Sequence, residues 1–175
     1  MKKISLTILG IPKPKQSVRS GVVYNHDGQP VMYKDKNSGR EKVLQRKFQP
    51  KEVEQHEQSM KLDIMSQLPQ GFEPFKGAIR INKLHYIFPP LKSFSKSKMR
   101  ILAEGGMIYK PTKPDVMDNL SKGLMDVLEG IVFLNDSQIV CAKDLAKFYG
   151  RKPRIEIELE EIDQVQMRLS TFWNN

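Results

Sequence analysis

Four charged side chains in one stretch of this chain have the types and spacing needed for phosphate chemistry: Asp115, Asp118, Lys122 and Asp136. Carboxylate oxygens are the ligands that hard divalent cations such as Mg²⁺ prefer, and one or two carboxylates suffice when substrate phosphates supply further oxygens. An ammonium group beside such an ion can stabilise the charge that develops on a phosphate. The alternative is purely structural, because acidic first turns and Asp–Lys pairs four residues apart also stabilise ordinary helices.

The stretch that carries these groups has the pattern of one amphipathic helix. Pro114 followed by Asp115 forms a helix-start signal with Asp115 as the N-cap, and Gly130 is a typical stop. Apolar residues recur at helical spacing and form one stripe: Leu120, Leu124, Val127, Leu128 and Ile131. At about 100° per residue, Asp118 and Lys122 lie roughly 40° apart on the opposite face. The sequence therefore predicts a helix that is anchored by one face and presents charged groups from the other.

Asp136 lies beyond this helix, directly before the strand-like run from Ile139 to Ala142. A strand that returns along the helix could bring Asp136 back to the helix start. We therefore expect a cluster of three carboxylates and one lysine, with Asp115, Asp118 and Asp136 as ligands of Mg²⁺ or Mn²⁺. Both ions favour oxygen ligands.

Three short motifs follow one another in this region: Asp118-Asn119-Leu120-Ser121-Lys122, then Met125-Asp126-Val127-Leu128, then Asn135-Asp136-Ser137-Gln138-Ile139. These motifs resemble those of the RusA-type Holliday junction resolvases, a family of small phage and prophage endonucleases. That family carries Asp-x-Asp-Asn-Leu-x-Lys, a helix with Asp-Ala-Leu or similar, and Asp-Asp-x-Gln-Val. The resemblance covers roughly residues 79–162 and a first strand.

The resemblance implies a Mg²⁺-dependent endonuclease that resolves four-way DNA junctions as a homodimer, by paired symmetric nicks, in recombination and repair. The metal-binding aspartates of the family correspond to Asp118 and Asp136, and its essential lysine corresponds to Lys122. One departure concerns Asp115, because two residues separate it from Asp118 where the family has one. A helical turn still brings residues three apart together, so Asp115 is a candidate third ligand.

Basic residues dominate the first third of the chain. The 175 residues carry a formal net charge of +9, and the segment through Lys51 alone holds twelve basic and three acidic residues. This asymmetry favours a polyanionic partner, most simply nucleic acid; a merely soluble basic surface is the alternative. The candidate DNA contacts lie in two basic stretches: Lys13, Lys15, Arg19, Lys34 and Lys36, and then Lys96, Lys98 and Arg100.

The remaining patterns predict a mixed α/β (α+β) domain with a RusA-like fold, in which helices pack on a small mixed sheet. Alternating residues predict strands at 3–9, 78–88, 138–149 and 154–162, and helical patterns cover 50–68 and 93–103. An Asp-Gly turn predicts a hairpin between 18–24 and 29–33, followed by a flexible basic segment at 34–47. Residues 1–162 then form a single domain with basic insertions at 18–49 and 91–112, and residues 163–175 form a tail.

Cys141 is the only cysteine, so a single chain cannot build a disulfide framework or a cysteine-based zinc site. This composition suits a reducing cytoplasm. The apolar run near the N-terminus is short and lacks a small-residue cleavage site, which favours a strand over a signal peptide. No run approaches the length of a membrane span, so we expect a cytoplasmic protein without a membrane partner.

Two alternatives to junction resolution stay open. Another structure-specific nuclease, one that cuts flaps or forks, would need the same carboxylates, because the choice of junction depends on dimer geometry and the layout of basic surface. A catalytically impaired protein that binds branched DNA is favoured by the altered spacing before Asp118. A structural phage protein is disfavoured by the intact Asp-Asn-Leu-x-Lys motif and the later Asp136.

Overall fold

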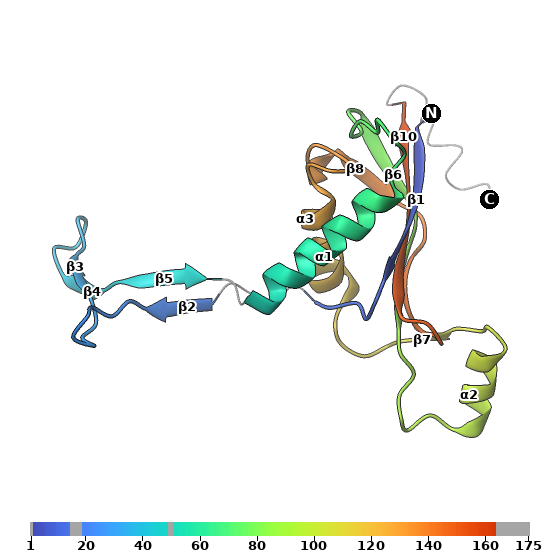
Figure 1. The fold of residues 1–175 in the computed structure, drawn as a ribbon, viewed down its shortest axis with the longest axis horizontal. Coiled ribbons are helices and arrows are strands. Elements are labelled where there is room, and N and C mark those ends of the chain that lie inside the picture. Colours follow the sequence, from blue (N-terminus) through green and yellow to red (C-terminus); the bar gives the residue numbers. More distant parts are fainter. Residues whose placement is uncertain (1, 15–18, 49–50, 164–175) are drawn as a thin grey trace. The chain divides into compact units, whose positions relative to one another are not determined.

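The computed structural model describes residues 2–14, 19–48 and 51–163, which fall into two compact units (Figure 1). One unit comprises Met1–Lys15 together with Ser59–Asn175, and the other comprises Gln16–Gln58. The boundary lies within helix α1 (Lys51–Gln67). The predicted limits of the endonuclease domain and of its two insertions remain predictions.

A six-stranded mixed sheet forms the centre of the larger unit. Its order is β1 (Lys3–Leu9), β10 (Arg154–Ile162), β6 (Ala78–Phe88), β9 (Leu145–Tyr149) and β7 (Ile108–Tyr109), and β8 (Ile139–Ala142) also pairs with β6. Strands β8 and β9 run parallel to β6, whereas the other neighbouring pairs are antiparallel. The predicted α+β class with a small mixed sheet is therefore confirmed.

The two faces of this sheet differ, as the alternating sequence requires. In β10, Ile155, Ile157 and Leu159 are buried, while the glutamates between them face the other side. There Glu156 and Glu160 pair with basic residues of β6, the former with Lys83 at 2.5 Å. One face thus carries the core and the opposite face carries cross-strand ion pairs.

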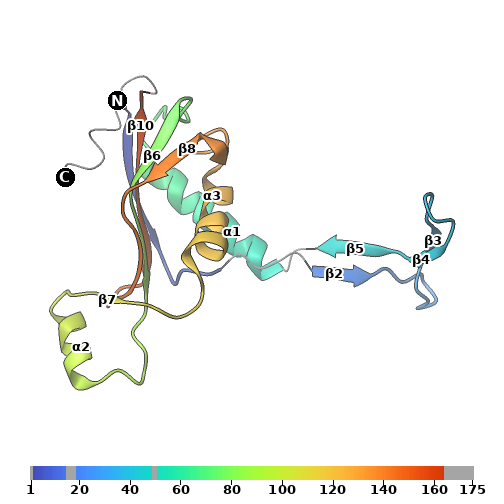
Figure 2. The same ribbon diagram turned by 180° about the vertical axis from the view of Figure 1, so that it is seen from behind.

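Helices cover the apolar face of the sheet (Figures 1 and 2). The acidic stretch forms one continuous helix whose first part is a π-helix, η1 (Val116–Ser121), and whose second part is α3 (Lys122–Leu128). Its buried residues join the core with Ile64 of α1 and with sheet residues such as Leu6, Ile79 and Tyr86. Each fully buried apolar side chain contributes about 1.5–3 kcal/mol, so this face holds the helix in place.

Both ends of the predicted central helix are confirmed. Asp115 is the N-cap, and the helix ends at Leu128 with Gly130 at a φ of 78°, a conformation that glycine adopts without strain. A further helix, α2 (Lys96–Ala103), lies within the predicted range 93–103 and has Ser95 as its N-cap. The predicted strands 3–9, 78–88 and 154–162 coincide with β1, β6 and β10.

One predicted strand is divided in two. The alternation at 138–149 predicted a single strand, but β8 ends at Ala142 and β9 begins at Leu145. Both pair with β6, and the interruption lies opposite Asn82 and Lys83, where the pairing of β6 with β10 also shifts register. A local irregularity of β6 therefore accounts for the interruption.

The smaller unit contains two short antiparallel ribbons in addition to the first part of α1. Strand β2 (Arg19–Val22) pairs with β5 (Gln45–Phe48), and β3 (Met32–Lys34) pairs with β4 (Glu41–Val43). The predicted turn is present, because the Gly28 N–H donates to the Asn25 carbonyl at 3.1 Å. The segment at 34–47, predicted to be flexible, instead contains β4 and most of β5. Strand β4 pairs with the nearby β3, and β5 pairs with the more distant β2.

In the described ranges no helix is both long and apolar enough to cross a membrane. The predicted tail lies outside those ranges after Asp163.

Candidate active site

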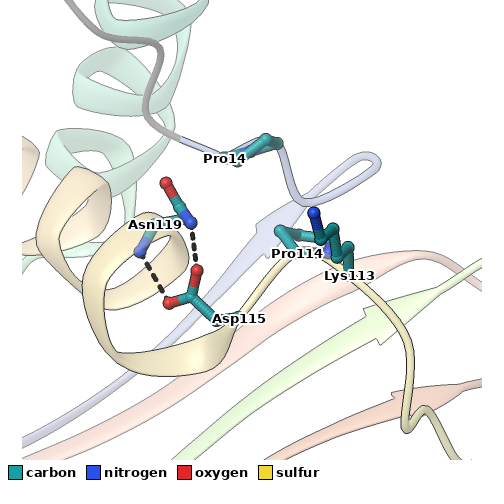
Figure 3. Close-up of a pocket in the computed structure, with 5 residues that line it drawn as sticks. All are labelled: Pro14, Lys113, Pro114, Asp115 and Asn119. Atoms are coloured by element: carbon teal, nitrogen blue, oxygen red, sulfur yellow. Dashed lines mark hydrogen bonds between the residues drawn. The ribbon is translucent and has the colours of Figure 1, made fainter.

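Asp115 caps the helix that carries the acidic motif. Its Oδ1 accepts hydrogen bonds from the backbone N–H groups of Asp118 and Asn119 at 2.8 and 3.1 Å, and its Oδ2 accepts one from the Asn119 side chain (Figure 3). These hydrogen bonds, above all the one from the Asn119 backbone, hold the pKa of Asp115 below its ordinary value. Both carboxylate oxygens of Asp115 therefore help to fix the first turn.

Asp118 and Lys122 present charged groups on the outer face of the same helix. Both side chains are exposed, whereas Leu120 and Leu124 on the inner face are buried. Within the part of the chain that the structure describes, neither charged group forms a hydrogen bond or an ion pair through its side chain. Asp118 and Lys122 are thus available to an ion or a substrate, while Asp115 already has protein partners.

Asp136 lies near the opposite end of the helix, which corrects its expected position. It opens the short 3₁₀ helix η2 (Asp136–Gln138), whose N-cap Asn135 accepts a hydrogen bond from the Ser137 N–H at 3.0 Å. The Asn135 amide also donates to Glu129, the residue that follows the last turn of α3, at 3.4 Å. Leu128 lies ten positions after Asp118 along the helix, which corresponds to a rise on the order of 15 Å.

Strands β8 and β9 follow Asp136 in the chain, and β9 returns to the start of the helix. Asp136 precedes both strands and is not carried back with them. The residue that β9 brings to the helix start is Lys147. Its ammonium donates to the carbonyl oxygens of Thr112 and Pro114 at 2.6 and 2.5 Å. Sequence reasoning missed Lys147, because an alternating pattern does not reveal which loop a strand residue faces until the strand order is known.

A second lysine reaches the same segment. Lys110 is buried, and its ammonium donates to the Thr112 hydroxyl at 2.6 Å and to the Lys113 carbonyl at 2.5 Å. The Tyr149 hydroxyl lies 3.4 Å from the same ammonium and 3.3 Å from the Thr112 hydroxyl. The hydrogen bond with Thr112, assisted by the two lysines, lowers the pKa of Tyr149 from its ordinary value.

A comparison with known proteins identifies the family. A family model described as endodeoxyribonuclease RusA matches residues 21–160, well over half of the chain. The chain belongs to the RusA endodeoxyribonuclease family. Among curated proteins, the uncharacterized protein YqaN of Bacillus subtilis (strain 168) is 43% identical over 75 residues, which are 42% of this chain and 51% of that relative. The match spans about half the length of that relative.

The wide first turn of the helix accounts for the spacing that departs from the RusA family motif. Segment η1 is a π-helix, which holds more residues per turn than an α-helix. The Ser121 hydroxyl donates to the Val116 carbonyl at 2.6 Å across this turn, and Met117 is 66% exposed. A wider turn absorbs one extra residue without rotating the helix that follows. The buried stripe and the exposed Asp118 and Lys122 therefore keep their faces.

RusA-family nucleases are generally dependent on a divalent metal. Among the residues that the structure describes, no group of three or more His, Cys, Asp or Glu side chains is arranged to hold a metal ion. Asp115 and Asp118 nevertheless supply two carboxylates within one helical turn, and Mg²⁺ commonly binds to one or two carboxylates together with substrate phosphates. Asp118, which is exposed and has no side-chain partner in the described ranges, suits such an ion. Ligation by Asp115, whose two oxygens accept hydrogen bonds, and by Asp136 remains a prediction.

An open pocket of about 570 Å³ adjoins Asp115 (Figure 3). It is lined by Pro14, Lys113, Pro114, Asp115 and Asn119. Its volume lies in the range of pockets that bind small molecules or cofactors. The pocket places an open volume next to the Asp115 carboxylate.

The predicted DNA contacts fall on both units, and their role remains a prediction. Lys13 is exposed after β1, and Lys34 and Lys36 are exposed at the end of β3 and in the turn after it. Lys15 lies outside the described residues, and Arg19 opens β2. On α2, Lys96, Lys98 and Arg100 are exposed, and Arg100 pairs with Glu104 at 2.8 Å.

Proposed function

We propose that this protein is a Mg²⁺-dependent endodeoxyribonuclease that resolves four-way DNA junctions in the cytoplasm, by paired symmetric nicks during recombination and repair. The observation that carries the proposal is the exposed pair Asp118 and Lys122, which have no side-chain partner among the described residues of a RusA-family chain. A carboxylate and an ammonium that lie one helical turn apart and are open to solvent are available to a metal ion and a phosphate, which supports a role in binding.

In this proposal Asp118 holds the divalent ion, and Asp115 and Asp136 are the further candidate ligands. Such an ion supplies a bound water of lowered pKa and neutralises charge on the phosphate. Lys122 lies one turn after Asp118 on the same face, and its ammonium stabilises negative charge on the phosphate or on the leaving oxygen. Asp115 orients Asp118 through the hydrogen bond to the Asp118 N–H.

The reaction is hydrolysis of a phosphodiester bond. Water attacks phosphorus, the bond to the leaving oxygen breaks, and the leaving oxygen takes up a proton. A 5′-phosphate remains on the product, as the family resemblance implies.

A homodimer completes the proposal. A four-way junction has two-fold symmetry and requires two opposed nicks, and a symmetric dimer presents two equal sites in a matching arrangement. Manganese is the natural substitute for Mg²⁺, because both ions favour oxygen ligands.

The test is cleavage of a synthetic four-way junction beside a linear duplex of the same sequence, with Mg²⁺ and with EDTA. Paired symmetric nicks in the junction alone, absent with EDTA, are the expected result. Cleavage of a flap or fork in preference to the junction would support a different structure-specific nuclease. Tight binding of the junction without nicks in Mg²⁺ or Mn²⁺ would replace the proposal with an impaired protein that binds branched DNA.

A further inference from the structure

The segment that leads into the acidic helix is held by two lysines that belong to the sheet. Lys110 follows β7 and Lys147 lies in β9, and the Lys110 backbone N–H donates to the Lys147 carbonyl at 3.0 Å. The two side chains leave these adjacent backbone positions toward the same stretch of chain. They contact residues Thr112, Lys113 and Pro114, the three that immediately precede the N-cap.

Every backbone carbonyl of this three-residue segment accepts a hydrogen bond from an ammonium group. The Thr112 carbonyl lies 2.6 Å from the Lys147 Nζ, and the Pro114 carbonyl lies 2.5 Å from the same atom. The Lys113 carbonyl lies 2.5 Å from the Lys110 Nζ. Because the carbonyl directions fix the backbone path of the segment, the sheet determines how the chain enters the cap at Asp115.

These lysines are unusual because their charge is not balanced by an acid. In the described ranges neither Lys110 nor Lys147 forms an ion pair with a carboxylate. Lys110 is only 9% exposed, and its Nζ lies 5.1 Å from the centre of the Phe88 ring and 5.2 Å from that of Tyr149. A buried ammonium is costly unless polar groups solvate it, and here carbonyl oxygens, hydroxyls and ring faces do so.

The number of N–H donors that each lysine already uses within the protein indicates whether it could also bind a DNA phosphate. An ammonium has three N–H donors. Those of Lys110 face the Thr112 hydroxyl, the Lys113 carbonyl and the more distant Tyr149 hydroxyl and Thr112 carbonyl, so no donor remains for a phosphate. Lys147 uses two donors on carbonyls. Both lysines therefore act chiefly on the protein's own backbone.

We propose that Lys110 and Lys147 are positioning residues of the cleavage site, which hold residues 112–114 so that Asp115 caps the helix and Asp118 and Lys122 face the substrate. This inference rests on the proposed nuclease function. The two ammonium groups fix the carbonyls of residues 112–114, and these residues fix the backbone at Asp115. The Asp115 carboxylate in turn accepts a hydrogen bond from the Asp118 N–H and so positions Asp118. Supporting residues of this kind typically change activity by roughly 10–100-fold when they are removed.

The experiment compares Lys147→Met and Lys110→Met with the control Lys143→Met. Methionine keeps the unbranched stem and removes the ammonium, and Lys143 is an exposed lysine in the β8–β9 connection that contacts no part of residues 112–114 through a recorded hydrogen bond. Amide hydrogen exchange is followed at Asp118 and Asn119, whose N–H groups the cap protects. In parallel, junction binding and the single-turnover cleavage rate are measured with Mg²⁺.

For Lys147→Met and Lys110→Met we expect faster hydrogen exchange at the Asp118 and Asn119 amides and a cleavage rate lowered by roughly 10–100-fold. The affinity for the junction should be unchanged in both variants. Lys143→Met should change none of these quantities. Lys147→Arg, which keeps charged donors, should recover part of the rate. If Lys110→Met does not fold because its site is buried, Lys147→Met and Lys147→Arg decide the question.

Unchanged exchange at both amides would overturn the inference, as would faster exchange with wild-type cleavage. A loss of junction affinity at unchanged rate would overturn it in favour of direct DNA contact. If the wild type itself does not cleave DNA, the proposed function fails, and the exchange measurement still decides whether the lysines hold the cap.

Discussion

Each end of the acidic helix has a capping side chain next to an exposed aspartate, although the residues that form the cap differ. At the start, Asp115 caps the first turn while Asp118 stays exposed; beyond the end, Asn135 caps η2 while the adjacent Asp136 stays exposed. In each place one polar side chain is occupied by backbone N–H groups and a neighbouring carboxylate has no side-chain partner among the described residues. The comparison separates residues that orient the backbone from residues that are free to bind.

The two ends of the helix differ in the side chains that fix the neighbouring backbone. The start is fixed by the ammonium groups of Lys110 and Lys147, whereas the end is fixed by the neutral amide of Gln138, which donates to the carbonyls of Phe75 and Gly77 at 3.0 Å each. The ammonium groups of Lys110 and Lys147 therefore add positive charge to the segment that leads into the start of the helix. In the proposed function this charge would attract a phosphate toward that end.

The largest expected effect comes from removing the free carboxylate at each end. Asp118→Asn and Asp136→Asn should each slow junction cleavage on the order of 10³-fold, because the loss of a metal ligand removes several kcal/mol of transition-state stabilisation. If both act in one step, the double variant should be no slower than the slower single variant. Single-turnover rates at saturating enzyme provide the measurement.

A multiplicative loss in the double variant would contradict this expectation and would show that the two ends act independently. The expected outcome also has a structural consequence. Leu128 lies on the order of 15 Å along the helix from Asp118, and Asn135, next to Asp136, contacts Glu129 just beyond that end. Action in one step would therefore require Asp118 and Asp136 to approach each other in the active assembly.

A smaller effect is expected at the cap beyond the helix. Asn135→Ala removes the hydrogen bond to the Ser137 N–H and should lower the free energy of unfolding by about 1 kcal/mol. Asn135→Asp keeps a capping oxygen and should be close to neutral. Urea denaturation measures both, and equal losses for alanine and aspartate would show that Asn135 contributes through its amide and not through capping.

The smallest effect concerns pH. The pKa of Asp115 is lowered in the folded protein, so the ionised Asp115 carboxylate stabilises the fold. This contribution to the free energy of unfolding is fully present above the ordinary carboxyl pKa and is lost as the pH falls through the lower folded value. Hydrogen exchange at Asp118 and Asn119 should thus lose protection only in acid. Asp115→Asn should remove this dependence, and an identical acid profile in the variant would assign it to another carboxylate.

The local parts of this site could be predicted from the sequence. The N-cap at Asp115, the stop at Gly130 and the buried stripe from Leu120 to Leu128 depend on neighbouring residues and on helical spacing, and the structure has all three. Ile131, the last residue of the predicted stripe, lies beyond the helix and is half-buried. Strand alternation likewise predicted β1, β6 and β10. These features are encoded within one element each.

The parts that depend on long-range pairing could not be predicted. The position of Asp136 follows from η2 lying next to Phe75 and Gly77, and the role of Lys147 follows from β9 pairing with β6. Strand β5 likewise forms only because it pairs with β2, more than twenty residues earlier in the chain. Sequence patterns indicate which face a residue occupies, but not which distant segment that face meets.

The most direct test of the central claim compares Asp118→Asn with Asp115→Asn on a four-way junction in Mg²⁺. Asparagine at position 115 retains a capping oxygen, whereas asparagine at position 118 loses the free carboxylate. The account predicts that Asp118→Asn slows cleavage on the order of 10³-fold without loss of junction binding, and that Asp115→Asn keeps the rate within roughly tenfold of the wild type. Equal loss in both variants would make Asp115 a metal ligand rather than a cap, and undiminished cleavage by Asp118→Asn would contradict the account as a whole.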